Sequence, residues 1–235
     1  NFRHMFDLRW SKAGLIACLL LFAQVAKAQR NNPYYDKKPL HYGFLVGLNS
    51  STFQMQVDAF DAARNDTLQY IEPGWGPGFQ LGVIGDLRLN HYMTLRLTPT
   101  LMFSQRNLLY TFENPVYNIR RAVQVASVDL PLLIKWRSER INNYRVYLVT
   151  GAKYGIDMAS QERVVEDVER VKTLRHDIGY EIGLGFDFYL PYFKFSPEIK
   201  FSSGLRNILV PENHVYAAPL LGLRARTIII SFNFE

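Results

Sequence analysis

The sequence of 235 residues predicts an all-β fold: an eight-stranded antiparallel transmembrane β-barrel with a charged, plugged lumen. Two observations predict it. From about Leu40 onward, apolar side chains alternate with polar or small ones in eight stretches, and the connections between the stretches are alternately long and short. Side chains of a β-strand point to opposite faces in turn, so each stretch has one apolar and one polar face. A strand with lipid outside and a polar lumen inside has this pattern.

The first 28 residues have the layout of a secretory signal peptide, because basic residues precede an apolar run from Ala13 to Val25 and small residues follow it. We expect cleavage between Ala28 and Gln29. The alternative is a lipoprotein site at Cys18, but Ile16 fits such a site poorly and the apolar run continues past it. Cys18 is the one cysteine, so the processed chain would carry no thiol. Residues 29–40 then form a periplasmic linker, and 41–235 form the barrel.

Composition excludes two classes of protein. After residue 30 no apolar run reaches the roughly 18 residues that a membrane helix needs. The predicted signal peptide holds four of the 27 basic and one of the 21 acidic residues, which leaves 23 against 20, a charge of +3. A nucleic-acid-binding surface needs a net basic stripe, so we expect no nucleic-acid partner.

The clearest alternation runs from Ile178 to Leu190, where apolar side chains occupy one face while Glu181 and Asp187 lie on the other. The other stretches repeat this pattern, and each has about the 9 to 11 residues that a tilted strand needs to cross a bilayer, or slightly more. The predicted strands are 41–51, 79–89, 92–105, 123–136, 144–155, 177–190, 192–203 and 221–234.

The connections predict the orientation of the barrel. The long connections are 52–78, 106–122, 156–176 and 204–220, and the short ones are 90–91, 137–143 and 191. Strict alternation places every long loop on one side, as in bacterial outer-membrane barrels with long external loops and short periplasmic turns. A soluble β-sandwich or lipocalin-like barrel has no reason to sort loops by length. Both termini are therefore expected in the periplasm of an outer-membrane protein.

The two-residue alternation also identifies the outward face of the barrel. Aromatic residues gather at the two ends of this face, as anchoring at the membrane interfaces predicts. The expected outward residues of five strands are Tyr42, Phe44, Val46 and Leu48; Phe79, Leu81, Val83, Leu87 and Leu89; Met93, Leu95, Leu97, Leu101 and Phe103; Val128, Leu130, Leu132, Ile134 and Trp136; and Ile228, Ile230, Phe232 and Phe234. The expected aromatic rims are Tyr42, Trp136, Tyr144, Phe193 and Phe234 on the periplasmic side, and Phe79, Phe103, Tyr154 and Tyr180 on the external side.

Three local features need separate interpretation. Pro99, Pro131 and Pro197 lie inside predicted strands, where each removes a ladder hydrogen bond, so we expect bulges there. The stretch 74–78, Gly-Trp-Gly-Pro-Gly, predicts a turn that enters the second strand. Residues 162–172 place valines near helical spacing; they form either a solvated loop or a short amphipathic helix that docks a partner.

The inward positions carry twelve ionisable side chains, seven basic and five acidic. An eight-stranded barrel is just wide enough inside for side chains to fill, so we expect a plugged lumen. Buried charges need partners, which favours a structural ion-pair network; a gated proton or ion path is the alternative. The twelve residues are Asp86, Arg88, Arg96, Asp129, Lys135, Arg145, Lys153, Glu181, Asp187, Lys194, Glu198 and Lys200.

No catalytic, metal or cofactor site is expected. A Ser-His-acid enzyme needs its base within hydrogen-bond reach of the nucleophile. His176 and Asp177 are adjacent on one strand and point to opposite faces, while His214, Ser104 and Ser203 are placed near other strand ends. The histidines are scattered and show no metal-ligand spacing.

Three segments carry a family resemblance: LGVIGDLRLNHYMTLRLTPTLMF (81–103), VDLPLLIKWRSERINNYRVYLVTGAKYGIDMAS (128–160) and GYEIGLGFDFYLPYFKFSPEIKFSSGLRN (179–207). Together they resemble the PorT family of outer-membrane barrels from Bacteroidetes, over essentially the whole processed chain. The LP-LL-K strand alone is weakly specific; its combination with R-NN-R-Y and GFDFYLPYFKFSPEIK is much more so. The resemblance implies a component of the type IX secretion system, needed for export of cargo with a C-terminal sorting domain and, in gliding relatives, for motility.

We therefore expect a non-enzymatic subunit of a secretion machine whose partners are outer-membrane lipid, other secretion subunits and, during biogenesis, the barrel assembly machinery. The chain ends in Phe234 and Glu235, so the usual terminal aromatic of an assembly signal is penultimate here. A general adhesion or structural barrel that binds ligands through its long loops is the main alternative. A small porin is the third.

Overall fold

The structure is a computed structural model that describes residues 31–33, 35–57, 68–112, 119–158, 173–209 and 220–235. The chain divides into two compact units, Asn1–Asn31 and Asn32–Glu235, and every described strand belongs to the second. The predicted signal peptide, its cleavage point between Ala28 and Gln29, and the segment 162–172 lie outside the described residues.

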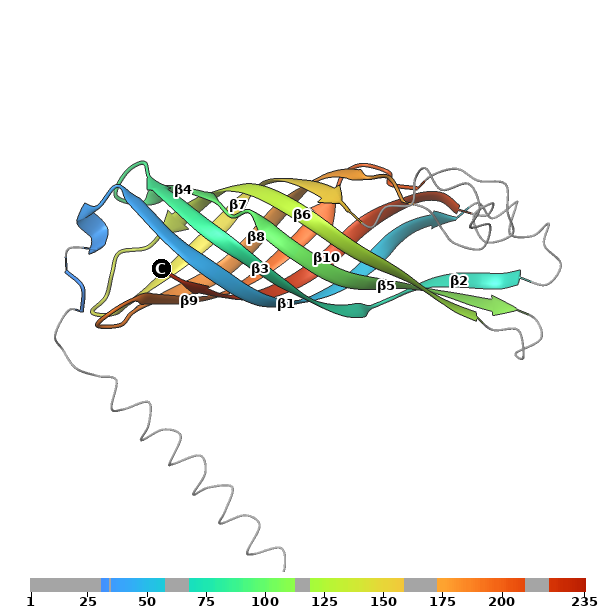
Figure 1. The fold of residues 1–235 in the computed structure, drawn as a ribbon, viewed down its shortest axis with the longest axis horizontal. Helices are drawn as coiled ribbons and strands as arrows, with labels where there is room; N and C mark the ends of the chain where they lie inside the picture. The colour runs from blue at the N-terminus through green and yellow to red at the C-terminus, as the bar shows by residue number, and fades with distance from the viewer. Residues whose placement is uncertain (1–30, 34, 58–67, 113–118, 159–172, 210–219) are drawn as a thin grey trace, which may run out of the picture. The chain divides into compact units, whose positions relative to one another are not determined.

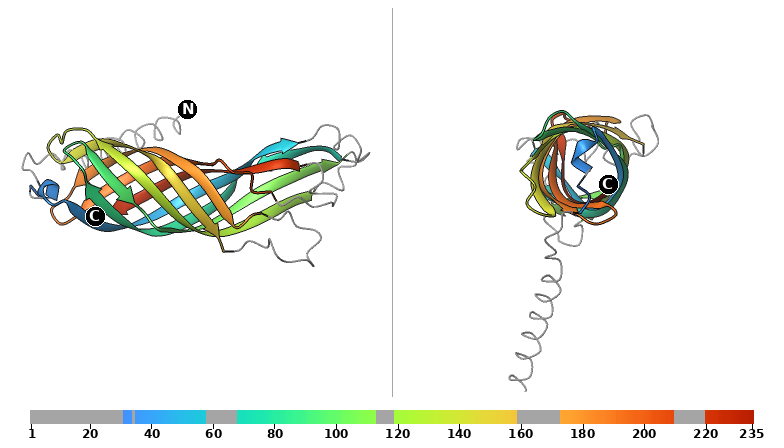
Figure 2. Two further views of the ribbon diagram at one scale, coloured as in Figure 1. Left: turned by 90° about the horizontal axis from the view of Figure 1, so that it is seen from above. Right: turned by 90° about the vertical axis from the view of Figure 1, so that its left-hand side faces the viewer.

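The second unit is a closed ring of antiparallel strands (Figures 1 and 2). β1 pairs with β10 on one side and with β3 on the other, which closes the sheet on itself. The predicted all-β antiparallel barrel is therefore confirmed. In chain order the elements are η1 (Tyr35–Lys37), β1 (Leu40–Val57), β2 (Leu68–Gly74), β3 (Gly76–Arg88), β4 (Met93–Leu97), β5 (Thr100–Phe112), β6 (Ile119–Arg137), β7 (Tyr144–Asp157), β8 (His176–Tyr189), β9 (Lys194–Gly204) and β10 (Leu220–Phe234).

The ten strands occupy eight positions in the wall, as predicted. β2 and β3 follow one another along the wall and both pair with β5, while β4 and β5 both pair with β6. Between the pairs Leu97↔Leu132 and Thr100↔Asp129 both strands advance by three residues. The β4–β5 strand is thus interrupted without losing register.

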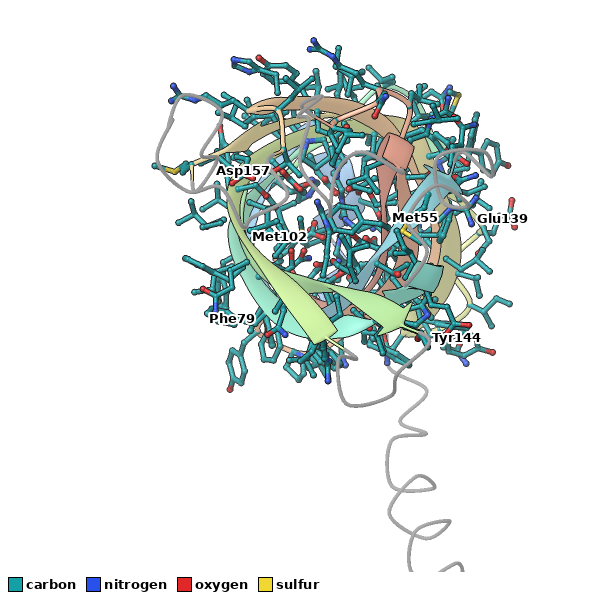
Figure 3. The ribbon with its side chains drawn as sticks, turned by 90° about the vertical axis from the view of Figure 1, so that its right-hand side faces the viewer. Met55, Phe79, Met102, Glu139, Tyr144 and Asp157 are labelled. Carbon is teal, nitrogen blue, oxygen red and sulfur yellow. The ribbon has the colours of Figure 1, made fainter. Side chains whose placement is uncertain are left out.

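The two ends of the ring differ. The end with the short connections also carries η1 and the last residue, at the left of Figure 1, and is called the turn end below. The strand ends that flank residues 58–67, 113–118, 159–172 and 210–219 lie together at the opposite end, the loop end. Figure 3 looks into the ring from the loop end.

The predicted outward face is confirmed, because the apolar side chains assigned to it are exposed or half-buried. On β1 the exposed fractions are 71 % for Tyr42 and 61 % for Leu48, whereas Leu45 between them is 3 % exposed. In Figure 3 Phe79 points away from the ring, and it is 49 % exposed, whereas Met102 on β5 is buried. The outer surface of this ring is therefore an apolar belt.

The wall continues further toward the loop end than the sequence predicts. β1 runs to Val57, β5 to Phe112, β6 starts at Ile119, and β2 lies within the predicted 52–78 loop. The sequence pattern inverts here: on β1 Phe53 is buried inside the ring, while Gln56 is exposed. An apolar inside and a polar outside suit a wall surrounded by water. Because the apolar positions move from the outward to the inward face here, the sequence pattern predicted strand ends that are too early.

The expected bulges at Pro99, Pro131 and Pro197 are wrong. The β6–β7 pairing keeps one register from Ser127↔Asp157 to Arg137↔Tyr147, past Pro131, and the β9–β10 pairing does the same past Pro197. A one-residue shift would turn every later side chain to the wrong face, which costs more than one lost ladder bond.

Hydrogen bonds around two of these prolines limit the loss. The carbonyl of Pro99 still accepts the Val83 N–H at 3.0 Å, and that of Pro131 accepts the Thr98 N–H at 3.2 Å. Pro131 cannot donate back to the carbonyl of Thr98. Instead the hydroxyl of Thr100 donates to that carbonyl at 2.7 Å.

The irregularity in register lies at Trp75 instead. Between the pairs Gly74↔Asn107 and Gly78↔Ser104, the β2–β3 strand advances by four residues while β5 advances by three. One extra residue in one strand is a β-bulge. The turn expected over 74–78 is therefore wrong, because this segment continues the wall.

The bulge reverses which positions face inward. Gln80 on β3 is buried and so is Ile71 on β2, although the two are an odd number of residues apart. Glycines permit the close approach of strands beside the bulge: a Cβ at Gly78 would collide with the carbonyl oxygen of Phe103. The bulge thus directs an apolar side chain into the lumen at the loop end.

Backbone pairing between β1 and β3 ends at Ser51↔Gly76. Beyond that point the described parts of β1 and β2 are not paired with each other. Their inward side chains Phe53 and Ile71 instead belong to one buried apolar cluster. Side-chain packing, not a backbone ladder, therefore connects β1 and β2 at the loop end.

Candidate functional site

Inside the ring lies a set of charged side chains contributed by β3, β4, β6, β7, β8 and β9. Eleven of the twelve predicted lumen residues are buried there, each at most 6 % exposed. These eleven are Asp86, Arg96, Asp129, Lys135, Arg145, Lys153, Glu181, Asp187, Lys194, Glu198 and Lys200.

Arg88 is the exception. It is half-buried at the end of β3, where its Nε donates to the carbonyl of Asn90 at 3.3 Å and its Nη2 lies 3.4 Å from Nδ1 of His91. Its long side chain reaches the turn that follows the strand. Arg88 therefore belongs to the turn end and not to the lumen network.

Arg96 is the centre of the network. Its guanidinium donates from Nε and Nη2 to the two carboxylate oxygens of Asp86, both at 2.7 Å, which is a bidentate pair. Nη2 also donates to Glu235 at 2.7 Å, and Nη1 to Glu198 at 3.3 Å. With the arginine 1 % exposed, three carboxylates share the donors of one buried cation.

A second group surrounds Asp187. Lys135 donates to its carboxylate at 2.8 Å and the hydroxyl of Ser196 donates at 2.7 Å, while the Nζ of Lys194 lies 3.9 Å away. The ammonium of Lys135 also lies 3.7 Å from the centre of the Tyr147 ring. Each charge in this group is compensated at short range.

Tyr147 joins the two groups, because its hydroxyl donates to Glu198 at 2.8 Å and the Arg96 guanidinium lies 5.8 Å from its ring centre. The network continues toward the loop end. Lys200 lies 3.2 Å from Glu181 and 3.6 Å from Glu198, and Lys153 lies 3.5 Å from Asp129.

The interior charges balance once every contributor is counted. The eleven buried residues comprise six bases and five acids, and Glu235, whose side chain is 0 % exposed, is a sixth acid. Arg106 and Arg137 are buried as well, and the half-buried carboxylates of Asp36 and Asp177 offset them. Isolated charges in such an environment would be very costly, but paired and hydrogen-bonded ones persist. The arrangement is that of a neutral, packed interior.

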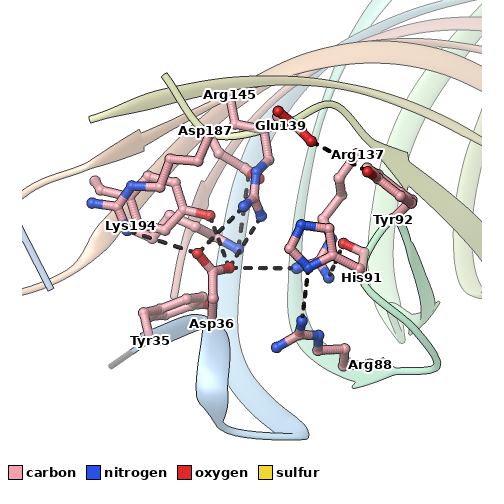
Figure 4. Close-up of polar contacts among 12 residues, drawn as sticks. Tyr35, Asp36, Arg88, His91, Tyr92, Arg137, Glu139, Arg145, Asp187 and Lys194 are labelled. Atoms are coloured by element: carbon pink, nitrogen blue, oxygen red, sulfur yellow. Dashed lines mark hydrogen bonds and ion pairs between the residues drawn. The ribbon is translucent and has the colours of Figure 1, made fainter. Parts of the chain in front are cut away.

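The turn end is closed by the segment before β1 (Figure 4). The carboxylate of Asp36 in η1 accepts two hydrogen bonds from the fork of Arg145, at 3.1 and 3.3 Å. Arg137 and Arg140 each lie 3.8 Å from the same carboxylate. Part of the predicted linker therefore packs into the mouth of the ring.

Tyr35 fixes this plug from the other side. Its hydroxyl donates to Glu235 at 3.0 Å, its ring stacks on His41 at 4.1 Å, and the Nζ of Lys194 lies 4.8 Å from its ring centre. Lys194 in turn donates to Glu235 at 2.6 Å. The N-terminal segment, the last residue and the lumen network thus form one bonded unit.

Electrostatics at the plug follow from burial and from the arginines. Burial raises the pKa of the Asp36 carboxyl, but the guanidinium groups of Arg145, Arg137 and Arg140 outweigh this effect and hold the pKa below its ordinary value. Burial raises the pKa of the Tyr35 phenol well above its ordinary value. At neutral pH the plug therefore carries an ionised Asp36 and a neutral, donating Tyr35.

The loop end is filled by apolar side chains. The buried cluster comprises Phe53, Ile71, Leu108, Ile208, Leu209, Leu223 and Ala225. Between this cluster and the network lies a small pocket, with a cavity volume of about 20 Å³, lined by Arg106, Ser127, Asp129, Lys153 and Asp177, among others. Arg106 is buried at the boundary, with its guanidinium 5.3 Å from the centre of the Phe53 ring.

The histidine considered for catalysis is engaged elsewhere. Nδ1 of His176 lies 2.8 Å from the Tyr154 hydroxyl, and the two rings stack outside the lumen. Ser104 and Ser203 are buried, and His214 lies outside the described residues. Among the residues that the structure describes, no three His, Cys, Asp or Glu side chains are grouped so that they could hold a metal ion. Within the same residues, no helix is long and apolar enough to span a membrane.

Sequence reasoning missed four contributors: Asp36, Tyr147, Ser196 and Glu235. Glu235 was detectable, because continuing period two from Ser231 and Asn233 of β10 places it on the inward face. Tyr147 lies at an inward position of β7 by the same rule. Asp36 precedes the strands, and no pattern in the sequence signals that its segment folds back.

Comparison with known proteins gives a family and a set of similar folds. A family model described as an outer membrane protein beta-barrel domain matches residues 22–210. No curated protein matches the chain.

Three solved structures are similar to it. OprG of Pseudomonas aeruginosa is 13 % identical, with 82 % of this chain and 94 % of that one covered and a TM-score of 0.44. Neisserial surface protein A is 7 % identical, with 83 % and 98 % covered and a TM-score of 0.42. Ail of Yersinia pestis, solved in complex with the heparin analogue sucrose octasulfate, is 15 % identical, with 82 % and 96 % covered and a TM-score of 0.37.

Proposed function

Because the chain belongs to the outer-membrane β-barrel domain family, we propose that it is a non-enzymatic outer-membrane subunit of the type IX protein secretion machinery. In this role it is needed for export of cargo with a C-terminal sorting domain and, in gliding relatives, for motility. The specific machine follows from the resemblance of residues 81–103, 128–160 and 179–207 to the PorT family.

The observation that carries the proposal is the filled lumen. The plug at Asp36, the ion pairs around Arg96 and Asp187, and the apolar cluster at Phe53 occupy the ring in succession along its axis. A barrel filled in this way offers cargo no passage through itself. Its role is then exerted through its surfaces, as an accessory or scaffold subunit, and the lumen network serves to hold the wall in shape.

In the proposed orientation the turn end faces the periplasm and the loop end faces outward, as in barrels with short periplasmic turns. Both termini of the processed chain are then periplasmic. The partners are outer-membrane lipid around the apolar belt, other secretion subunits at the turns or loops, and the barrel assembly machinery during biogenesis.

Deleting the gene tests the secretion role. Cargo with a C-terminal sorting domain should then accumulate in the periplasm instead of reaching the medium, as measured by immunoblotting of both fractions. Complementation with the wild-type gene is the control. It should restore export when the complemented strain contains as much of the protein as the wild-type strain. Unchanged secretion in the deletion strain would refute the role.

A general adhesion or structural barrel is the second candidate. The favouring observation is the extension of β1, β5 and β6 past the apolar belt, which raises the loop end above the predicted membrane surface. Exchanging the segments 58–67, 113–118, 159–172 and 210–219 for short linkers separates the candidates. Loss of surface binding with normal cargo export favours adhesion; loss of export favours the secretion subunit.

A further inference from the structure

Three arginines lie together on the outer surface at the loop end: Arg206, Arg224 and Arg226, here called the arginine patch. Arg224 and Arg226 belong to β10, and Arg206 follows the end of β9 by two residues. All three are exposed, and none forms an ion pair or hydrogen bond with a residue that the structure describes. Three cations on one surface, without an acidic partner among the described residues, form a candidate site for an anionic ligand.

The strand register places Arg224 and Arg226 side by side. Arg226 is opposite Ser203 of β9 and Thr52 of β1, and Arg224 is opposite Gln54. Two residues along one face of a strand span about 7 Å, so the two guanidinium groups of β10 can reach the same ligand.

Arg206 joins the patch through its neighbours. The side chain of Asn207 donates to the carbonyl of Leu221 at 3.2 Å, and the N–H of Ile208 donates to the carbonyl of Leu223 at 2.9 Å. The segment that carries Arg206 therefore runs alongside β10 next to Arg224.

The patch begins where the apolar belt ends. On the outward face of β10 the side chains proceed from Phe232 through Ile230 and Ile228, which are 38, 45 and 39 % exposed, to Arg226 and then Arg224. With a tilt of about 45°, each two-residue step moves about 5 Å along the membrane normal. Arg226 therefore lies about 5 Å beyond Ile228, the last apolar side chain described on this face of β10, at the depth of lipid headgroups. Leu205 and Leu221, which are 58 and 59 % exposed, lie beside the patch.

The surroundings favour an anion at this depth. The positions of β1 beside the patch are uncharged, namely Thr52, Gln54 and Gln56. Tyr180 of β8, opposite Ser203 and 42 % exposed, provides an aromatic side chain two strands away in the same register. An ordinary solvated surface would mix both signs of charge, whereas this one is basic beside an interfacial tyrosine.

We propose that the arginine patch binds phosphate groups of membrane lipids in the leaflet around the loop end. A guanidinium is always charged and donates to phosphate oxygens through a planar fork, so arginine suits this ligand better than lysine. Lipid phosphates lie at headgroup depth, which is where the patch lies. A soluble anion could bind at any height on the protein and does not require this position. The inference rests on the membrane location of the barrel and is independent of the secretion role.

The test uses the full-length protein in phosphatidylcholine nanodiscs that contain either diphosphorylated lipid A or its dephosphorylated form. Native mass spectrometry measures the lipid A retained per barrel over a titration. The wild type should retain the phosphorylated lipid and not the dephosphorylated one. The triple variant R206Q/R224Q/R226Q should bind it on the order of 100-fold more weakly, at about 1 kcal/mol for each arginine near a membrane surface.

A matched variant, K38Q/R88Q/R120Q, removes three cations outside the patch and should retain the lipid as the wild type does. All proteins are first checked for the heat-dependent gel shift of a folded barrel. Equal retention by the patch variant, or equal loss in the matched variant, would overturn the proposal. So would release of the bound lipid by an excess of inorganic phosphate or of a sulfated oligosaccharide, because the site would then be one for soluble anions.

Discussion

At the scale of single residues, Arg96 decides whether the lumen is stable. Removing one partner of a buried ion pair leaves the other charge uncompensated, which costs far more than the pair contributes. Arg96 compensates Asp86, Glu198 and Glu235 together, and its inward position was evident from the alternation of β4. Loss of Arg96 is therefore expected to lower the free energy of unfolding more than loss of any surface ion pair.

We expect Arg96→Met to lower the free energy of unfolding by about 3–5 kcal/mol, because three buried carboxylates lose their common cation. Urea unfolding in lipid vesicles, followed by tryptophan fluorescence, measures the change. Arg88→Met is the control; its half-buried side chain contacts only the turn, so its effect should stay within about 0.5 kcal/mol. Equal effects of the two substitutions would contradict the central position of Arg96.

Asp36 makes the plug dependent on pH. Its pKa in the folded protein lies below the ordinary value, so the ion pair with Arg145 stabilises the docked plug above the ordinary pKa. This stabilisation is lost as the pH falls through the lowered pKa of the folded state. Plug release is therefore expected only at a pH below about 3.9, the ordinary pKa of an aspartate.

A spin label at the exposed position Lys38, introduced as Lys38→Cys, reports the release. Its motion should be slow at neutral pH and become fast in acid, while the ring keeps its heat-dependent gel shift. In the same background Asp36→Asn should give fast motion at every pH. A slow label in Asp36→Asn would show that the stacked Tyr35 alone holds the plug.

At the scale of the strands, alternation predicts facing well and strand ends poorly. Facing depends on one local rule, so the outward residues of β1, β8 and β10 were correctly assigned. The ends of β1 and β5 were predicted wrongly because the apolar side chains change from the outward to the inward face where the wall leaves the apolar belt. The bulge at Trp75 could not be predicted, since it depends on a register between β2 and β5 that no single strand encodes.

Pro131 provides a test of how strands accommodate a missing donor. Thr98 and Pro131 form a hydrogen-bonded pair that lacks one of its two bonds, and the Thr100 hydroxyl satisfies the free carbonyl of Thr98. Thr100→Val should therefore cost about 1–3 kcal/mol, because it leaves a buried carbonyl without a donor. In a Pro131→Ala background the alanine N–H can donate instead, and the same substitution should cost clearly less.

A double-mutant cycle measured by urea unfolding gives the coupling between the two positions. We expect a value of about 0.5–1.5 kcal/mol, the net worth of one hydrogen bond. Thr94→Val, at another buried threonine of the same wall position, is the control that should not couple to Pro131. Additive effects of Thr100→Val and Pro131→Ala would exclude the compensating bond.

At the scale of the whole molecule, three barriers of different chemistry lie in series along the ring. The turn end is closed by the Asp36 plug, the middle by ion pairs around Arg96 and Asp187, and the loop end by apolar packing around Phe53. Composition and facing predicted the middle barrier only. The other two depend on chain ends and strand extensions that fold back onto the ring.

Barriers in series predict how conductance responds to their removal. In planar bilayers the wild-type protein should show no steady conductance. Removing residues 31–38 should also leave it silent, because ion pairs and apolar packing still fill the lumen. Current should appear only when this truncation is combined with Tyr147→Gly, which opens space between Arg96 and Lys135, and with Phe53→Ser at the loop end. A steady current through the truncated protein alone would mean that the plug is the single barrier, and the molecule would then be a gated pore instead of a filled scaffold.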